Sequence, residues 1–167
     1  MPNIKSIINK HNKQITAPQP IVINQNTCNC IVKETCPLNG NCQASSLVYE
    51  ATIKSNQPDK KYIGLCETTF KKRFGTHKLS LRNRNYENST TLSKEYWKLK
   101  DNNGNPSVTW RIVRHKRAYT PETNNCRLCL HGKYEIANYP GRNLINKRTE
   151  IISKCRHRRK FLLELCE

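Results

Sequence analysis

Closely spaced cysteines constrain this chain more than any other feature of its sequence. Four of the nine cysteines lie between residues 28 and 42, separated by turn-forming residues that leave no room for a helix or a strand. Cysteines at this spacing bind zinc in intracellular proteins and form disulfides in secreted ones. We therefore expect a metal-bound knuckle, with a disulfide framework as the alternative. Its predicted ligands are Cys28, Cys30, Cys36 and Cys42.

A second set of metal-ligand residues lies near the C-terminus. Cys126 and Cys129 present two sulfurs from one helical turn, a spacing common in zinc sites. Two more ligands must come from elsewhere, and Cys155 with His157 is the best-placed pair. The sequence thus favours a second structural zinc ion.

The ligands of this second site stay open at the level of sequence. His115 and His131 are rivals to the Cys155-x-His157 pair, and buried apolar packing is the alternative for the cysteines. Cys66 and Cys166 have no partner at a suitable spacing. We expect both to be plain thiols.

The chain is strongly basic and only modestly apolar. Of its 167 residues 35% are hydrophobic, and 30 Lys and Arg against 12 Asp and Glu give a net charge of +18. A small core needs a second source of stability, such as bound metal. The charge suits a polyanion, with nucleic acid as the leading partner. No membrane-length apolar run and no secretory signal is present, so we expect an intracellular protein without a membrane partner.

Alternating and helical apolar patterns predict an α+β fold. Alternation predicts strands over 47–53, 61–66 and 108–115, the first two joined as a hairpin. The element order describes a small three-stranded antiparallel sheet flanked by helices. Helices are predicted over 4–8, 68–82, 92–100 (with Leu92, Tyr96 and Leu99 inward), 126–138, 144–152 and 158–165.

Composition divides the chain into three parts. The N-terminal part is basic and contains Pro18 and Pro20, which is typical of a linker. The predicted parts are a basic arm or linker over 1–26, a Cys-rich zinc knuckle over 27–45, and the main domain over 46–167.

Four polar side chains are expected to converge in the main domain. Tyr49 and Tyr62 lie on the paired strands, and Arg73 and His77 share one helix face at i and i+4. Phosphodiester hydrolysis needs a base for water, a cation beside the developing charge, and usually a metal held by a carboxylate. These residues can supply the first two. The plainer alternative is two sheet tyrosines and a solvated phosphate contact.

Basic side chains along the chain are the expected DNA contacts. They gather in the helix after the second strand, around the third strand, and near the C-terminus. The predicted DNA-binding residues are Lys71, Lys72, Lys78, Arg82, Arg84, Arg111, Arg114, Arg158, Arg159 and Lys160.

Several short motifs resemble those of a known nuclease family. Leu47-Val48-Tyr49, Tyr62-Ile63-Gly64 and Phe70-Lys71-Lys72-Arg73-Phe74-x-x-His77 resemble the GIY-YIG nucleases. The wider pattern is similar to the endonuclease of Penelope-like retroelements and covers nearly the whole chain. That pattern includes Cys-Pro-Leu-Asn-Gly, Leu92-Ser93-Lys94, Trp97-Lys98-Leu99-Lys100, Cys126-x-x-Cys129-Leu130, Asn146-Lys147-Arg148 and His11-Asn12-Lys13.

The resemblance implies a fold, an activity and residue roles. It implies the GIY-YIG nuclease fold and metal-dependent nicking of double-stranded DNA with Mg²⁺ or Mn²⁺. The exposed 3′ end would prime DNA synthesis by a reverse transcriptase of the same element. The resemblance also implies that the protein acts in the nucleus. Tyr49 would match the first motif tyrosine, although Leu47-Val48 replaces Gly-Ile, and Tyr62 the second. Arg73 would stabilise the phosphate, His77 or Tyr49 would activate water, and Asn146 would support the site.

One position departs from the family pattern. The glutamate that holds the catalytic metal in the resembled nucleases is replaced here by Gly132. Close packing, an introduced inactivating substitution and natural decay are the alternatives, and Glu135 would replace the ligand only after a backbone shift. We expect DNA binding with very slow nicking. The competing hypotheses are a non-catalytic zinc-dependent nucleic-acid-binding module and a secreted cationic disulfide protein.

Overall fold

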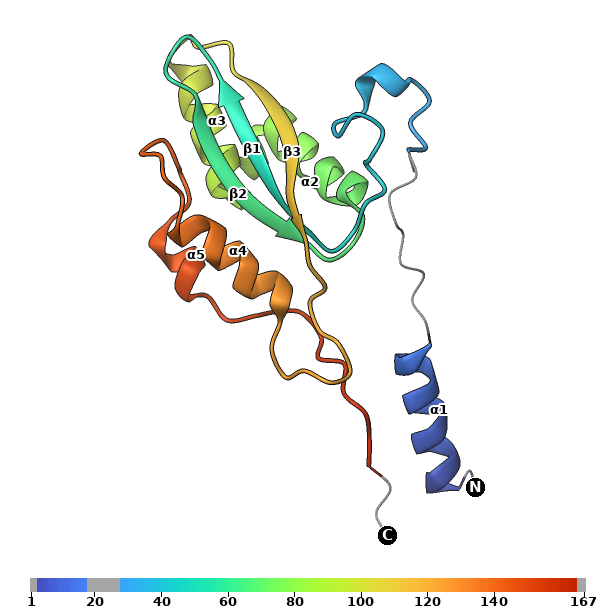
Figure 1. Cartoon of the computed structure of the whole chain (residues 1–167). Helices are drawn as coiled ribbons and strands as arrows, with labels where there is room; N and C mark the ends of the chain where they lie inside the picture. Colours follow the sequence, from blue (N-terminus) through green and yellow to red (C-terminus); the bar gives the residue numbers. More distant parts are fainter. Residues whose placement is uncertain (1–2, 18–27, 165–167) are drawn as a thin grey trace.

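The computed structural model describes residues 3–17 and 28–164 (Figure 1). Pro18, Pro20 and Cys166 therefore lie outside the described residues. No helix among those described is long and apolar enough to cross a membrane. The elements are α1 (Ile4–Thr16), η1 (Lys33–Thr35), β1 (Leu47–Lys54), β2 (Lys60–Cys66), α2 (Phe70–Arg82), η2 (Arg84–Ser89), α3 (Thr91–Asp101), β3 (Ser107–His115), α4 (Arg127–Ala137) and α5 (Arg148–Ile152).

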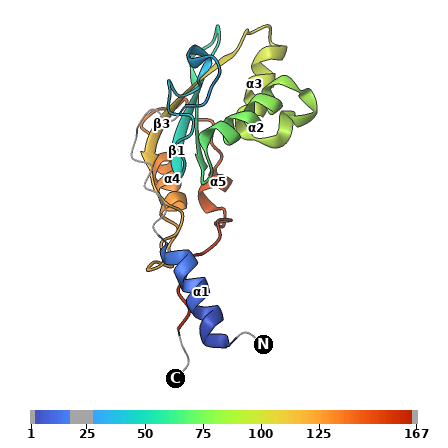
Figure 2. The ribbon, with the colours of Figure 1, turned by 90° about the vertical axis from the view of Figure 1, so that its right-hand side faces the viewer.

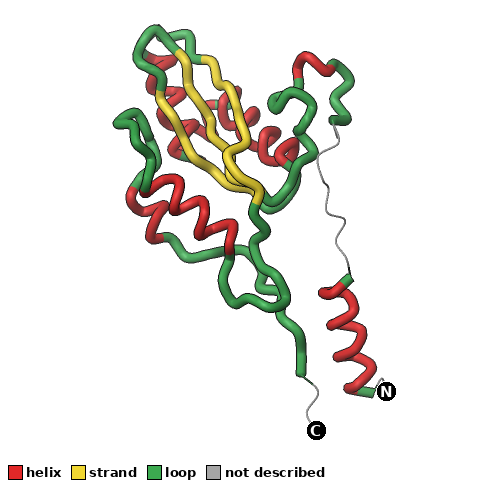
Figure 3. The backbone as a smooth tube through the Cα atoms, in the orientation of Figure 1, coloured by secondary structure: helices red, strands yellow, loops and turns green. Residues whose placement is uncertain are grey.

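The three strands form one antiparallel sheet with β1 at its centre (Figure 3). In the β1–β2 pair, Tyr49 lies opposite Gly64 and Ala51 lies opposite Tyr62. The pairing of β1 with β3 shifts register between Val48 and Tyr49. The predicted α+β class and the three-stranded antiparallel sheet are confirmed.

Helices pack on two sides of the sheet, with α2 and α3 together on one side (Figure 2) and α4 against the other. On one side, Tyr49 of β1 packs with Phe70 of α2 and Leu92 of α3. On the other side, Val48 of β1 packs in a second cluster with Leu128 of α4. Because successive side chains of a strand point to opposite faces of the sheet, neighbouring residues of β1 and β2 belong to different clusters.

The helix α3 follows the predicted range but buries a different aromatic residue. Leu92 and Leu99 are buried as predicted, whereas Trp97 takes the inward place expected for Tyr96. The Trp97 indole N–H donates to the backbone carbonyl of Ser80 at 2.9 Å. That bond satisfies the one polar atom of the larger ring, so Trp97 can be buried at little cost.

Two predictions in the C-terminal part are corrected. The segment 144–152 is helical only from Arg148, because Leu144 pairs with Lys61 of β2 as an isolated parallel bridge. The predicted helix over 158–165 is wrong for residues 158–164, which are described and not helical. Their backbone bonds to α1 instead: Asn12 receives the Leu163 N–H and donates to its carbonyl, both at 2.8 Å.

The helix α1 is longer than predicted and lies beside the C-terminal segment. It extends from Ile4 to Thr16, beyond the expected Ile4–Ile8. The His11 ring contacts the Phe161 carbonyl at 3.2 Å, next to the Asn12–Leu163 pair. The two ends of the described chain are thus tied together through side-chain to backbone hydrogen bonds (Figure 1).

Gly64 is required by the tight packing of β2 on the Tyr49 ring. A Cβ atom at position 64 would lie 2.4 Å from the Tyr49 Cζ, whereas a Cβ at Gly75 would meet nothing within 4 Å. We expect Gly64→Ala to destabilise the fold by about 1–3 kcal/mol through overpacking. The matched Gly75→Ala should stabilise α2 by about 0.5–1 kcal/mol. Urea unfolding of both variants checks this, and equal stability of the two would contradict it.

Candidate functional site

The Tyr49 hydroxyl joins two side chains of α2 in one polar group. It lies 2.7 Å from His77 Nε2 and accepts a hydrogen bond from Arg73 Nε at 3.1 Å. The phenol oxygen accepts from Arg73, and the tautomer of the imidazole sets whether His77 Nε2 donates to the hydroxyl or accepts from it. Tyr49 therefore fixes the guanidinium of Arg73 on one side and the imidazole of His77 on the other.

Burial decides which members of this group can meet a ligand. Tyr49 and His77 are 0% and 1% exposed, while Arg73 is half-buried. Burial raises the pKa of Tyr49 to about 12 and, with the charge of Arg73, lowers the pKa of His77 to about 3. Both groups are neutral near pH 7, and the His77 Nδ1 atom has no hydrogen-bond partner. The pair is suited to orient Arg73 rather than to touch a bound molecule.

Tyr62 and Asn146 lie at the β2 edge of the same group. Burial raises the pKa of Tyr62, and the Arg73 guanidinium opposes that rise by its charge and hydrogen bonding. Asn146 receives the Ile63 N–H at 2.7 Å and donates to the Ile63 carbonyl at 2.8 Å. It thereby extends the edge of β2 directly after Tyr62. The structure thus brings together Tyr49, Tyr62, Arg73 and His77, with Asn146 beside them.

Gly132 lies on the other side of β2. A Cβ at this position would meet Leu65 Cδ2 at 2.7 Å, and Leu65 packs in the cluster beneath α4. Gly64, which precedes Leu65 in β2, faces the Tyr49 ring on the opposite side of the sheet. The close-packing explanation of Gly132 therefore has direct geometric support. Glu135, considered as a replacement ligand, is ion-paired with Arg114.

A carboxylate that sequence reasoning missed lies next to Asn146. Glu150 of α5 accepts hydrogen bonds from the Asn146 side-chain amide and from Thr91 Oγ1, the latter at 2.8 Å. Its negative charge contributes to the raised pKa of both Tyr49 and Tyr62. The i to i+4 spacing of Asn146 and Glu150 within the helix predicted over 144–152 was the available signal, although the observed α5 begins only at Arg148.

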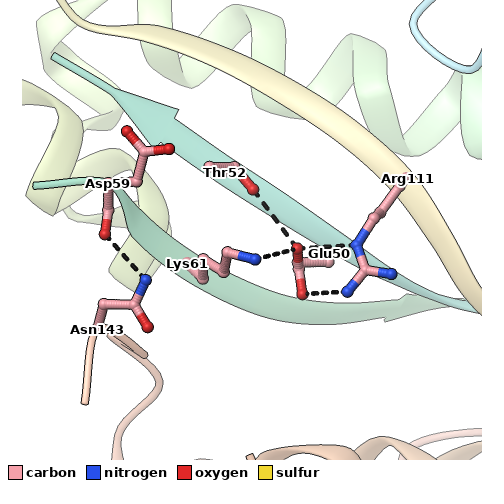
Figure 4. Close-up of polar contacts among 6 residues, drawn as sticks. All are labelled: Glu50, Thr52, Asp59, Lys61, Arg111 and Asn143. Atoms are coloured by element: carbon pink, nitrogen blue, oxygen red, sulfur yellow. Dashed lines mark hydrogen bonds and ion pairs between the residues drawn. The ribbon is translucent and has the colours of Figure 1, made fainter. Parts of the chain in front are cut away.

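Three of the predicted DNA-binding arginines are engaged in ion pairs. Arg111 makes a bidentate pair with the buried Glu50, which also accepts from Lys61 (Figure 4). The Arg111 side chain nevertheless stays 63% exposed. Arg84 pairs with Asp101 and Arg114 with Glu135. The hydrogen bonds from Arg111 and Lys61 hold the pKa of Glu50 below its usual range.

The remaining predicted DNA contacts divide into one bound lysine and a freely exposed set. Lys71 Nζ donates to the Asn29 side chain at 2.6 Å and so ties α2 to the knuckle. The others are exposed and make no ion pair with any described residue. They are Lys72, Lys78, Arg82, Arg158, Arg159 and Lys160.

The four knuckle cysteines form a cluster that could hold a metal ion. All four sulfurs lie within 4.8 Å of one another. The Cys42 sulfur lies 3.6 Å from that of Cys28 and 3.7 Å from that of Cys30. A zinc–sulfur bond of about 2.3 Å places tetrahedral sulfurs roughly 3.8 Å apart, whereas a disulfide needs about 2.05 Å. The turn before Cys42 is sharp, since Asn39 and Gly40 have φ of 48° and 95°.

The downstream cluster has the predicted ligand set. His157 Nδ1 lies 3.4, 3.2 and 3.5 Å from the sulfurs of Cys126, Cys129 and Cys155. The four donor atoms lie within 4.8 Å of one another, and neither rival histidine belongs to the cluster. Two sites that could hold a metal such as zinc are therefore present. The buried thiol of Cys66 is in neither cluster, and burial raises its pKa to about 11.

Searches against protein-family models, curated proteins and solved structures found no match to this chain.

The knuckle carbonyls accept hydrogen bonds from the first turn of α2, so loss of the knuckle metal should destabilise that turn. The Phe70 and Lys71 N–H groups donate to the carbonyls of Ala44 and Cys42 at 2.8 and 2.7 Å. We expect two zinc ions per chain by elemental analysis. Cys42→Ser should lower this to one and speed hydrogen exchange of the two amides. Those amides report on the helix that carries Arg73.

Two cysteine variants serve as controls for this experiment. Cys155→Ser should also remove one zinc ion but leave the exchange of the Phe70 and Lys71 amides unchanged. Cys66→Ser should retain both ions. Protein purified without chelator that carries no zinc would contradict both metal sites.

Proposed function

We propose that this chain is a DNA-nicking endonuclease domain, in which the group around Arg73 binds the scissile phosphate. The observation that carries the proposal is the anchored guanidinium: Arg73 is fixed by the buried Tyr49 hydroxyl yet remains half-buried. A cation held beside a developing phosphorane charge stabilises it without reorganisation. Target-primed reverse transcription, with a polymerase of the same retroelement as partner, is the wider role that the family resemblance implies.

The residues divide into Arg73, which would face the substrate, and buried or half-buried residues that would support it. Arg73 would bind the phosphate, and Tyr62 lies beside it at the strand edge. Tyr49 and His77 would hold the orientation of Arg73, because both are buried. Asn146 would keep the β2 edge in place through Ile63. A bound Mg²⁺ or Mn²⁺ would supply Lewis-acid stabilisation and activate water.

The surrounding charge supports a nucleic-acid substrate. The chain carries +18, and exposed basic side chains free of ion pairs occur both on α2 and in the C-terminal segment. If about six phosphates are neutralised, log affinity should fall with log salt at a slope near roughly −5. A non-catalytic zinc-dependent nucleic-acid-binding module is the second candidate. The absence of a carboxylate at Gly132 favours it.

Arg73 and its neighbour Lys72 separate the two functions. We expect Arg73→Gln and Lys72→Gln each to weaken binding of a duplex and to reduce the salt slope by about one. Arg73→Gln alone should abolish the slow Mn²⁺-dependent nicking of supercoiled plasmid, because only Arg73 is anchored at the polar group. Equal nicking rates in the two variants would favour the binding module. Robust nicking by the unaltered chain would contradict the expected slow rate.

Restoring a carboxylate at position 132 requires room as well as charge. Gly132→Glu alone should gain little, because Leu65 fills the space that the new side chain needs. Combined with Leu65→Ala, Gly132→Glu should still leave plasmid nicking near the parental rate, because position 132 lies across β2 from Tyr49 and Arg73. A rise of about tenfold in this double variant alone would instead place the catalytic cation on α4. Gly132→Gln with Leu65→Ala is the control of matched shape. If both double variants nick equally, a carboxylate at 132 has no role.

A further inference from the structure

Glu150 stands out among the carboxylates of this basic chain. It is half-buried, and it forms no ion pair with any lysine or arginine of the described residues. Glu67 is also half-buried and without an ion pair, but only Glu150 of the two has hydrogen bonds to both carboxylate oxygens from described residues. Glu50, Glu95 and Glu135 are all paired with cations. Partial desolvation of an unpaired carboxylate costs free energy. In a chain rich in lysine and arginine, a cationic partner would be easy to supply. The lack of such a partner at Glu150 suggests that its carboxylate has another ligand.

Neutral donors fix both oxygens of this carboxylate. Oε1 accepts from Thr91 Oγ1 at the start of α3, and Oε2 accepts from the Asn146 amide. Asn146 is itself held by both backbone groups of Ile63, which follows Tyr62 in β2. Thr91 joins α5 to the side of the sheet that carries α2 and α3 (Figure 2). The carboxylate is thereby oriented from α3 directly and from β2 through Asn146.

A carboxylate held in this way suits a hard divalent cation. Mg²⁺ and Mn²⁺ take oxygen ligands and commonly bind through one or two carboxylates together with phosphate oxygens and water. Hydrogen bonds from amides and hydroxyls to a ligating carboxylate fix its direction. The residues present thus fit such an ion, with Glu150 as donor.

We infer that the Glu150 carboxylate is the protein ligand for a divalent cation beside Tyr62 and Arg73, so that metal reaches this site from α5 and not from α4. The inference rests on the proposed function, which supplies the phosphate that completes the coordination. It makes Gly132 a packing residue. A cap role for Glu150 is the plainer explanation, but its contact with the Lys147 N–H is long, at 3.5 Å.

The first test maps Mn²⁺ on the zinc-loaded full chain by NMR. We expect the Ile63 backbone amide and the Asn146 side-chain amide to broaden more than other signals, because paramagnetic broadening falls steeply with distance. The map needs no variant. Strongest broadening around Glu135 or Glu50 would overturn the inference.

The second test measures Mn²⁺ affinity by electron paramagnetic resonance. Glu150→Gln keeps the size of the side chain and should weaken Mn²⁺ binding at least about tenfold. Glu150→Asp keeps the charge, and its Mn²⁺ affinity should fall between those of the parent and Glu150→Gln. The control Glu135→Gln should bind like the parent. Zinc content and dispersed amide spectra establish that each variant is folded, and a folded Glu150→Gln with parental affinity overturns the inference.

The failure of this site and the failure of the nuclease function give different results. If Mn²⁺ binding depends on Glu150 but nicking is indifferent to Arg73, the cation site stands and the nuclease function fails. If nicking depends on Arg73 while Glu150→Gln binds Mn²⁺ normally, the function stands and Glu150 is only a cap.

Discussion

The buried hydroxyl of Tyr49 is the contact on which the rest of the site depends. It stands on the central strand, and its ring needs the missing side chain of Gly64 on the neighbouring strand. The same hydroxyl binds Arg73 and His77 of α2, so it links the sheet to the helix through polar contacts inside an apolar cluster. A buried polar network of this kind is stable only in one arrangement. The position of Arg73 is therefore fixed by the core and not by surface contacts.

We expect metal ligation to stabilise the knuckle, because hydrophobic burial there is small. The knuckle contributes few buried apolar side chains, among them Leu38 and Ala44, yet its carbonyls receive the first N–H groups of α2. Those N–H groups have no partners within the helix and need an external acceptor. The order of the knuckle is thus transmitted to the turn that precedes Arg73. Burial raises the pKa of Cys42 to about 12, a cost that a bound cation would relieve.

Local pattern predicted the sheet because each strand has one strongly apolar side. Val108, Trp110 and Ile112 alternate with the exposed Thr109 and Arg111, which is the period of a strand. The same approach failed where non-local backbone pairing decides the structure. Leu144 pairs with β2, and Leu163 pairs with Asn12, so neither segment is free to be helical. No periodicity within those segments carries that information.

The candidate site shows the same division. Tyr49, Tyr62, Arg73 and His77 could be placed together from strand pairing and helix spacing, because each lies on a regular element. Glu150 could not, since its place depends on how residues 143–146 follow the edge of β2.

Arg73 and Glu150 carry opposite charges and shift the pKa of Tyr62 in opposite directions, yet no ion pair joins them within the described chain. Direct pairing would satisfy the guanidinium and remove it as an anion ligand. Tyr49 holds Arg73 by its Nε, while Thr91 and Asn146 hold the two oxygens of Glu150. Neutral hydrogen-bond partners thus keep the two charges apart. Such an arrangement leaves one group for a phosphate and the other for a cation, which is how a preorganised phosphodiester site differs from a surface salt bridge.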